Sequence, residues 1–341
     1  MSFKVTLQPT GHQFAAATDT TILQAALDAE LVIPYGCKDG ACGSCKARVI
    51  SGQIDHGRSP LTTLSADERE KGIGLMCCAH AMSDVEVECR EVRRTTDIPI
   101  RKLPCRVQSL TKAADDVMVL SVKLPANDPF RFMAGQYVDF LLAGGKRRSF
   151  SMANPPHQAE ALELHIRAVE GGFFTSQVFS TMKERDILRI EGPLGGFYLH
   201  EGDKPIIFLA GGTGFAPIKS IIEDMAQRSI RRPVHFYWGS RDLAGLYQHE
   251  LAQGWARELP DFRYVPVISD AQPEGWTGRT GFVHEAVMAD HPDLSRFDVY
   301  ACGAPAMIDA ARRDFTARCN LHADTFFADA FTFSADNTQS T

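Results

Sequence analysis

The chain has 341 residues and a formal net charge of -6 at pH 7, with 44% hydrophobic and 23% charged residues. At about 150 residues per domain, this length predicts two or three domains of ordinary globular composition. The negative charge gives no electrostatic reason to expect nucleic acid. No apolar run approaches the roughly 20 residues that span a bilayer, and Met1 to Val5 lack the apolar core of a signal peptide. These features predict a soluble cytoplasmic protein without a membrane partner.

The first segment combines strand patterns with a helical one. Alternating apolar and polar residues at 3–7 and 85–88 predict strands, and the spacing of apolar residues in 20–27 predicts a helix between them. Residues 91–102 are polar and contain Pro99, which is typical of an exposed linker. We therefore expect a first domain over residues 1–91 and a linker over 92–102.

The cysteines of this segment have a spacing typical of metal ligands. Nine cysteines in a reducing compartment are poor candidates for disulfides, so clustered ones are interpreted first as ligands. Cys37, Cys42 and Cys45 follow C-x4-C-x2-C, and Cys77 comes after 31 further residues. This spacing is typical of a plant-type [2Fe-2S] cluster. The alternative is a structural zinc site, which usually needs two short ligand pairs where this chain has one C-x2-C.

The residues around these cysteines carry a family resemblance. The run from Tyr35 to Cys45, together with Leu75-Met76-Cys77-Cys78-Ala79, closely resembles plant-type ferredoxins over the first 90 residues. The resemblance implies a β-grasp domain. Aligning the family's L-x-C-x-A pattern selects Cys77 as the fourth ligand and leaves Cys78 spare. The remaining distant cysteines are interpreted as buried apolar side chains: Cys89, Cys105 and Cys319.

Residues 103–200 read as short alternating strands separated by Gly and Pro, which predicts an antiparallel barrel. Arg148-Ser149-Phe150-Ser151 follows a predicted strand at 137–140, and Gly171-Gly172-Phe173-Phe174-Thr175 opens a predicted helix. An arginine presents a bidentate fork to phosphate, and a helix N-terminus offers unpaired N–H donors. Taken alone, either motif is more simply a charged strand end or a glycine turn.

The order and separation of these two motifs resemble the flavin domain of the ferredoxin-NADP reductase superfamily. The resemblance implies an FAD site in which Arg148 pairs with phosphate, Phe150 stacks on the flavin and Ser151 lies near the hydride-accepting nitrogen. Phe150 replaces the family's tyrosine and so lacks its hydroxyl. The implied FAD-binding set also includes Ser149, Gly171, Gly172, Thr175, His165, Ile166 and Arg167. An isolated histidine such as His165 is, in the alternative interpretation, a core residue.

Residues 201–335 alternate apolar strands with helices, which predicts a Rossmann-like parallel nucleotide-binding domain, and 336–341 is expected to be a flexible tail. A glycine turn runs from Gly211 to Pro217 between a strand at 206–210 and a helix. Such turns let the backbone approach a pyrophosphate at the positive end of the helix. The predicted contacts are Gly212, Thr213, Gly214 and Pro217.

Near the end of the chain, the run from Cys302 to Met307 matches the superfamily's C-G-x-P-x-M element. The resemblance implies that Cys302, Gly303 and Pro305 lie by the nicotinamide, although Cys302 has the alternative role of a packed thiol. The segment 327–331 resembles the terminal aromatic segment that shields the flavin, with Phe331 as its predicted contact. After the second strand, Ser240 and Arg241 are candidates to bind the 2′-phosphate of NADPH, but the neighbouring Asp242 leaves NADH equally open.

Together the resemblances cover nearly the whole chain and are similar to the reductase components of bacterial multicomponent oxygenases, such as those of terephthalate dioxygenase. They imply that NAD(P)H gives a hydride to FAD and that single electrons pass through the cluster to a terminal oxygenase or another electron-accepting protein. Ser151 and Cys302 are the predicted catalytic residues. Two alternatives stay open: the CDP-6-deoxy-glucoseen reductase of deoxysugar biosynthesis, which shares the domain order, and a redox sensor without turnover.

Overall fold

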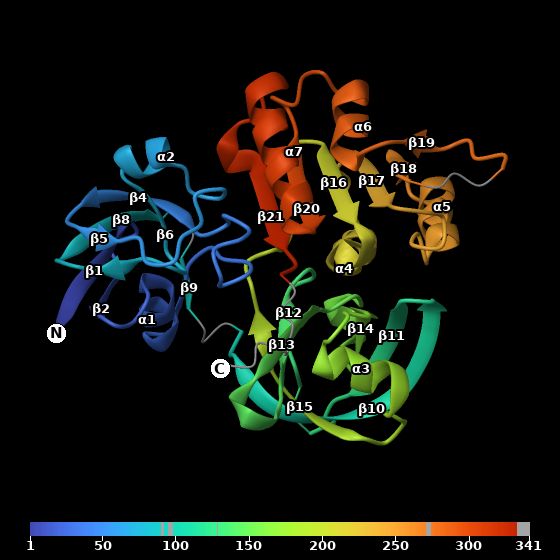
Figure 1. Cartoon of the computed structure of the whole chain (residues 1–341), viewed down its shortest axis with the longest axis horizontal. Helices are drawn as coiled ribbons and strands as arrows, with labels where there is room; N and C mark the ends of the chain where they lie inside the picture. Colours follow the sequence, from blue (N-terminus) through green and yellow to red (C-terminus); the bar gives the residue numbers. More distant parts are fainter. Residues whose placement is uncertain (90–91, 95–97, 128, 271–273, 333–341) are drawn as a thin grey trace. The chain divides into compact units, whose positions relative to one another are not determined.

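The computed structural model describes residues 1–89, 92–94, 98–127, 129–270 and 274–332. Their strands form three large sheets and two small ones (Figure 1). The chain divides into two compact units. One holds residues 1–100 with 195–197 and 328–330, and the other holds most of the predicted FAD-binding range 103–200 and nucleotide-binding range 201–335. These two ranges are called the flavin segment and the nicotinamide segment below. Part of the predicted linker and the predicted tail at 336–341 lie outside the described residues.

The N-terminal unit is built on a mixed sheet with the order β2-β1-β8-β4-β6. Its central strands β1 and β8 run parallel, and β1 pairs antiparallel with β2 on its other side. Helix α1 (Ile22–Asp28) begins after Thr21, whose hydroxyl accepts the N–H of Gln24 at 3.2 Å. The predicted strands and helix are confirmed. The bounds are β1 Ser2–Pro9, β2 Gln13–Ala17, β4 Lys46–Ser51, β6 Ile73–Leu75, β8 Val85–Cys89 and helix α2 Ala66–Glu70.

Two short ribbons complete this unit. Strand β3 (Leu31–Val32) pairs with β9 (Arg93–Arg94), and β5 (Ile54–Asp55) pairs with β7 (His80–Ala81). The start of the predicted linker is thus a paired strand in the structure, and the next long strand begins at Arg101.

The flavin segment forms a six-stranded antiparallel sheet with the order β13-β12-β15-β10-β11-β14. A bridge between Met152 and Leu164 joins its two ends, so the predicted antiparallel barrel is confirmed. Leu162, Leu164 and Ile166 of β14 are 0% exposed in its core, as the alternation of the sequence requires. The bounds are β10 Arg101–Ala114, β11 Val117–Lys123, β12 Tyr137–Leu141, β13 Arg147–Ser151, β14 Ala161–Arg167, β15 Ile187–Leu194 and helix α3 Phe173–Ser180.

The nicotinamide segment forms a third sheet, with the order β19-β18-β17-β16-β20-β21. Strand β16 pairs in parallel with both β17 and β20, so the direction in which successive strands are added reverses at β16. In open α/β sheets, ligands bind outside the carboxyl ends of the strands at such a switch point. The bounds are β16 Ile206–Gly211, β17 Val234–Ser240, β18 Phe262–Ile268, β19 Arg279–Thr280, β20 Asp298–Gly303 and β21 Phe326–Ala330.

The helices of this segment are α4 Phe215–Gln227, α5 His249–Glu258, α6 Val283–Asp290 and α7 Pro305–Arg318 (Figure 1). Short 3-10 helices lie at Ala143–Gly145, Pro156–Gln158, Gly212–Gly214 and Ala323–Thr325. Within the described ranges, no helix combines the length and the apolar character needed to cross a bilayer.

Candidate functional site

The four predicted cluster ligands lie in the N-terminal unit as two pairs. The Cys42 N–H donates to the Cys37 sulfur at 3.2 Å, and the Cys37 N–H donates to the Cys42 sulfur at 3.4 Å. The sulfurs of Cys45 and Cys77 lie 3.2 Å apart. Since a [2Fe-2S] cluster has two irons and four thiolate ligands, two thiolates for each iron, this pairing fits the cluster.

Backbone donors surround these sulfurs. Ser44 donates its backbone N–H to the Cys42 sulfur at 3.4 Å, and Cys77 donates its backbone N–H to the Cys45 sulfur at 3.5 Å. A hydrogen bond from the Cys37 thiol lowers the pKa of Cys42 to about 5 against the opposing effect of burial, and the same hydrogen bond raises the pKa of Cys37. Without a metal, one sulfur of this pair is thus favoured as the thiolate and the other as the thiol. Across the described residues, no three His, Cys, Asp or Glu side chains are arranged to hold a single metal ion.

Glycines make room for the ligand loop. A Cβ on Gly36 would lie 3.0 Å from the Cys42 sulfur, and one on Gly40 would lie 2.9 Å from the Cys78 sulfur. Gly40 also has a φ of +88°, which disfavours any other residue. The ligand loop therefore requires glycine at these two positions.

The predicted flavin motif occupies the end of strand β13. Ser151 is 5% exposed, and its hydroxyl has no hydrogen-bond partner among the described residues. A buried hydroxyl without a partner is costly, so Ser151 fits a site completed by a polar atom of a bound flavin. Arg148 is half-buried and donates to the carbonyl of Arg147 at 2.7 Å. Phe150 is half-buried and packs on Phe174, with the ring centres 5.5 Å apart.

The glycine pair before helix α3 is shaped by close approach. Gly171 has a φ of +71°, and a Cβ on Gly172 would lie 2.6 Å from the Thr175 hydroxyl. Thr175 is buried, and its hydroxyl donates to the backbone carbonyl of Gly172 at 3.2 Å. The predicted motif therefore forms a compact turn that leads into the N-terminus of α3, where backbone N–H groups lack helical partners.

Ser151→Ala is expected to slow reduction of the bound flavin by NAD(P)H about tenfold, because one hydrogen bond to the reacting ring is lost. Ser180→Ala at the end of helix α3 is the control, because Ser180 lies outside the predicted FAD-binding set and its hydroxyl donates to the backbone carbonyl of Ser176 at 2.6 Å. The hydroxyl of Ser149, which belongs to that set, donates to Asp139 at 2.6 Å. Stopped-flow absorbance of the flavin measures both rates. Equal rates in the two variants would remove Ser151 from the flavin site.

The two nicotinamide motifs meet at the switch point. Ala210 of β16 stands opposite Cys302 of β20, which places the following residues side by side. A Cβ on Gly214 would lie 2.0 Å from the Cys302 carbonyl oxygen, and one on Gly303 would lie 3.0 Å from the Gly211 carbonyl oxygen. Cys302 is 0% exposed. The glycines thus let two loops pack together where a nucleotide is expected to bind.

The other predicted nucleotide contacts lie around this turn. Thr213 and Pro217 are buried, and Pro305 is the first residue of α7, where a proline is tolerated. The Phe331 N–H donates to the Gly303 carbonyl at 2.8 Å, so the terminal segment is anchored to the C-G-x-P-x-M element.

The predicted 2′-phosphate site lies at the end of β17. Ser240 is half-buried, Arg241 is exposed, and the Asp242 carboxylate accepts the N–H of Gly245 at 2.9 Å.

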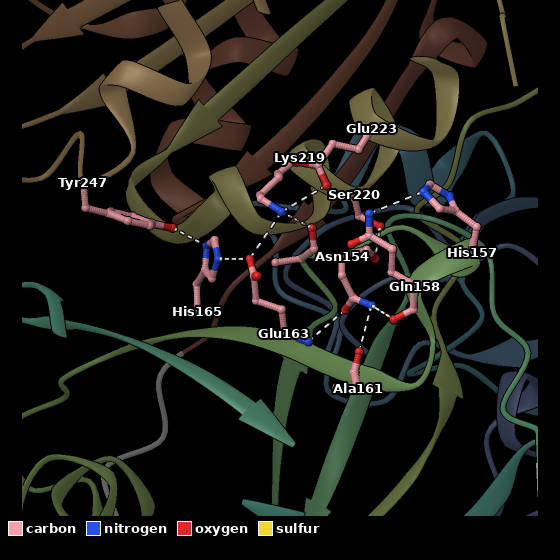
Figure 2. A network of polar contacts seen from close by, with 11 residues as sticks. Asn154, His157, Gln158, Ala161, Glu163, His165, Lys219, Ser220, Glu223 and Tyr247 are labelled. Atoms are coloured by element: carbon pink, nitrogen blue, oxygen red, sulfur yellow. Dashed lines mark hydrogen bonds and ion pairs between the residues drawn. The ribbon is translucent and has the colours of Figure 1, made fainter. Parts of the chain in front are cut away.

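The strand that carries His165, Ile166 and Arg167, all predicted to line the flavin, also contacts other parts of the chain. The His165 ring is hydrogen-bonded to the Tyr247 hydroxyl at 2.8 Å and to Glu163 at 2.9 Å, and Ile166 lies in the barrel core. Arg167 forms an ion pair with Asp116 at 3.0 Å. Figure 2 shows the network around His165, which includes Lys219 on helix α4.

Sequence reasoning did not single out Glu163, Lys219 or Tyr247. Two signals were present: Lys219 and Ser220 interrupt an apolar run from Phe215 to Ile222, and Glu163 lies two residues before His165, on the same face of the strand.

Comparison with known proteins covers all three segments. Residues 5–82 match the 2Fe-2S iron-sulfur cluster binding domain, 104–198 the oxidoreductase FAD-binding domain and 208–313 the oxidoreductase NAD-binding domain. The chain is 45% identical to the CDP-6-deoxy-L-threo-D-glycero-4-hexulose-3-dehydrase reductase of Yersinia pseudotuberculosis, with 97% of this chain and 99% of that protein covered.

Two further relatives are similar along their length. Reductase component 1 of the Comamonas terephthalate 1,2-dioxygenase is 34% identical, with 98% of both chains covered. The crystal structure of an Amycolatopsis cytochrome P450 reductase is 34% identical with a TM-score of 0.77, covering 97% of this chain and 99% of that one. This chain therefore belongs to the family of NAD(P)H-dependent iron-sulfur flavoprotein oxidoreductases that join a [2Fe-2S] ferredoxin, an FAD-binding and an NAD-binding domain.

Proposed function

We propose that this chain takes a hydride from NAD(P)H onto FAD and passes single electrons through its [2Fe-2S] cluster to a separate partner protein. The observation that carries the proposal is the presence of two cysteine sulfur pairs, Cys37 with Cys42 and Cys45 with Cys77, in a chain with FAD- and NAD-binding domains. NAD(P)H gives two electrons at once and the cluster accepts one, and a bound flavin supplies the chemistry that converts between them.

The residues of the chain have separate tasks in this function. Cys37, Cys42, Cys45 and Cys77 are the proposed cluster ligands. Ser151 is proposed to hold the reactive edge of the flavin through its buried hydroxyl, and Arg148 to hold the phosphates. The Gly212–Gly214 turn and Cys302 are proposed to bind and orient the nucleotide so that its ring meets the flavin.

The proposed partner is a terminal oxygenase, because the Comamonas relative is a component of a dioxygenase system. A second candidate is a sugar-nucleotide dehydrase, favoured by the 45% identity to the Yersinia dehydrase reductase against 34% for the dioxygenase component. We place the activity in the cytoplasm, since none of the nine cysteines, all within the described ranges, forms a disulfide.

The purified protein is expected to contain about two irons, two sulfides and one FAD per chain, and to oxidise NAD(P)H rapidly with ferricyanide as acceptor. Metal, sulfide and flavin analysis with an absorbance assay tests this. Zinc without acid-labile sulfide would overturn the cluster assignment, and absence of NAD(P)H oxidation would favour the redox sensor. Adding a terminal oxygenase or a CDP-sugar dehydrase to the reduced protein then identifies the class of partner by turnover.

If the enzyme prefers NADPH, Arg241→Ala is expected to weaken NADPH binding at least tenfold and NADH binding less than twofold. The reason is that a guanidinium-phosphate contact is charge-assisted and only NADPH carries the 2′-phosphate. Half-saturating concentrations of both nucleotides in steady-state assays measure the difference. Equal effects on the two nucleotides would exclude Arg241 from the selectivity role.

A further inference from the structure

Strand β14 presents alternate residues to the barrel core and to the nicotinamide segment. Leu162, Leu164 and Ile166 are 0% exposed in the core. On the opposite face, Glu163 lies 3.3 Å from the Lys219 ammonium, and His165 lies 2.8 Å from the Tyr247 hydroxyl. Further along that face, a Cβ on Gly212 would lie 2.6 Å from the Arg167 guanidinium. One face of this strand therefore contacts the nicotinamide segment from Glu163 to Arg167.

Lys219 is the centre of these contacts. It is 7% exposed, and its ammonium lies 3.3 Å from Glu163 and 3.0 Å from Glu223 while donating to the carbonyl of Ala153 at 3.2 Å. A buried ammonium is stable only when its donors are paired, and these three partners supply that pairing. Glu223 belongs to the same helix as Lys219, whereas Glu163 and Ala153 belong to the barrel.

A second bond joins the same helix to the barrel. The Ser220 hydroxyl donates to the carbonyl of Asn154 at 2.8 Å, and the Asn154 side chain accepts the N–H of Glu163 at 2.8 Å (Figure 2). Ala153 and Asn154 lie two and three residues after Ser151 in the chain. Helix α4 is therefore bonded to the segment that continues from the predicted flavin motif.

The protonation states give the hydrogen bonds a direction. Burial opposes ionisation of Glu163, but the hydrogen bond from His165 and the charge of Lys219 outweigh it and lower the pKa of Glu163 to about 2. Burial lowers the pKa of His165 despite Glu163, which favours the neutral ring. The carboxylate only accepts, so the His165 Nε2 donates to it and its Nδ1 accepts the Tyr247 hydroxyl. Glu163, His165 and Tyr247 therefore each have one defined donor or acceptor role in these hydrogen bonds.

Strand β14 contacts helix α4 through Lys219 and the segment after β17 through Tyr247, and both of these elements are expected to hold the nucleotide. Lys219 is in the second turn of the helix that follows the Gly212–Gly214 turn, and Tyr247 lies between β17, which ends at Ser240, and helix α5. We propose that Glu163, His165 and Lys219 are positioning residues that hold the nucleotide-binding turn at the distance from the flavin that hydride transfer requires. This inference rests on the proposed function, and it assigns a role to residues outside both cofactor motifs.

The ion pair between Glu163 and Lys219 is called the link below. Breaking this link is expected to slow hydride transfer without weakening nucleotide binding, because small errors in donor-acceptor geometry greatly lower the rate. In Glu163→Gln, the limiting rate of flavin reduction in stopped-flow experiments is expected to fall at least tenfold, with the half-saturating NAD(P)H concentration within twofold of the wild type. Lys219→Arg keeps the charge and is expected to stay within threefold in rate.

Glu223→Gln is the matched control, since it removes a carboxylate bonded to the same ammonium but within the helix. Its limiting rate is expected to stay within twofold. Lys219→Met leaves Glu163 and Glu223 without their cation and is prone to unfold. The double variant Glu163→Gln/Lys219→Met is therefore used beside it, because it removes both charges of the Glu163–Lys219 ion pair. It is expected to show the same tenfold loss with full FAD content.

Wild-type rates in Glu163→Gln and in the double variant would overturn the positioning role, as would an equal loss in Glu223→Gln. Weaker nucleotide binding at an unchanged limiting rate would overturn it too, because the link would then act on affinity. If the wild-type protein itself fails to reduce its flavin with either nucleotide, the proposed function is wrong, so the two failures are distinguishable.

Discussion

Cys77→Ala is expected to abolish the visible absorption of the [2Fe-2S] cluster, whereas Cys78→Ala is expected to keep it. The Cys77 sulfur lies 3.2 Å from the sulfur of Cys45, and this pairing is the reason that we propose these two as the ligands of one iron. The Cys78 sulfur lies 3.7 Å from that of Cys77 and faces Gly40, where a Cβ would come within 2.9 Å of it. Cys78 therefore packs against the ligand loop, and its loss removes only a small apolar side chain.

Loss of the cluster is expected to affect electron transfer to ferricyanide and electron transfer to the partner protein differently. Without its cluster, the Cys77 variant is expected to reduce ferricyanide near the wild-type rate, because ferricyanide can take electrons from the flavin directly. Transfer to the partner protein is expected to fall more than a hundredfold, since its single-electron donor is missing. Iron content, ferricyanide reduction and partner-linked turnover are measured in both variants.

Two outcomes would contradict this assignment. Loss of the cluster in Cys78→Ala but not in Cys77→Ala would show that the ligand register is wrong by one residue. Full partner turnover in a cluster-free Cys77 variant would exclude the ferredoxin domain from the electron path.

Gly214→Ala is expected to weaken NAD(P)H binding at least tenfold and to destabilise the protein by roughly 1–3 kcal/mol, the usual cost of overpacking. The new Cβ would lie 2.0 Å from the carbonyl oxygen of Cys302 and 2.5 Å from its carbonyl carbon. Both atoms are backbone, so relief requires separating the ends of β16 and β20. Half-saturating nucleotide concentration and thermal unfolding report the two effects.

Gly254→Ala in helix α5 is the control for this substitution. Its Cβ would meet only the Arg257 guanidinium, at 3.9 Å, and alanine is favoured over glycine inside a helix by about 0.5–1 kcal/mol. The control is expected to bind nucleotide normally and to be slightly more stable. Normal nucleotide binding by Gly214→Ala would show that the turn does not form part of the nucleotide site.

Short-range patterns in the sequence were sufficient to predict which types of domain the chain contains. Alternation in 117–122 and 162–166 correctly predicted barrel strands, and the C-x4-C-x2-C spacing correctly predicted a ferredoxin domain, because pleat and ligand loop are short-range properties. The approach of the Gly211–Pro217 turn to a pyrophosphate stays a prediction, and the structure adds that a Cβ at Gly172 or Gly214 would meet Thr175 or the Cys302 carbonyl.

Long-range pairing was decided only by the tertiary structure. The sequence placed Cys77 beside a spare Cys78, but the partnership of Cys77 with Cys45 depends on how β4 and β6 bring residues 32 positions apart together. In the same way, the hydrogen bond of His165 to Tyr247, 82 positions away, depends on tertiary packing, while its predicted place beside the flavin stays a prediction. A periodic pattern specifies which face of a strand a residue occupies, but only the packing of other elements against that face specifies its partner, and this is why Glu163 and Lys219 became visible as a pair only in three dimensions.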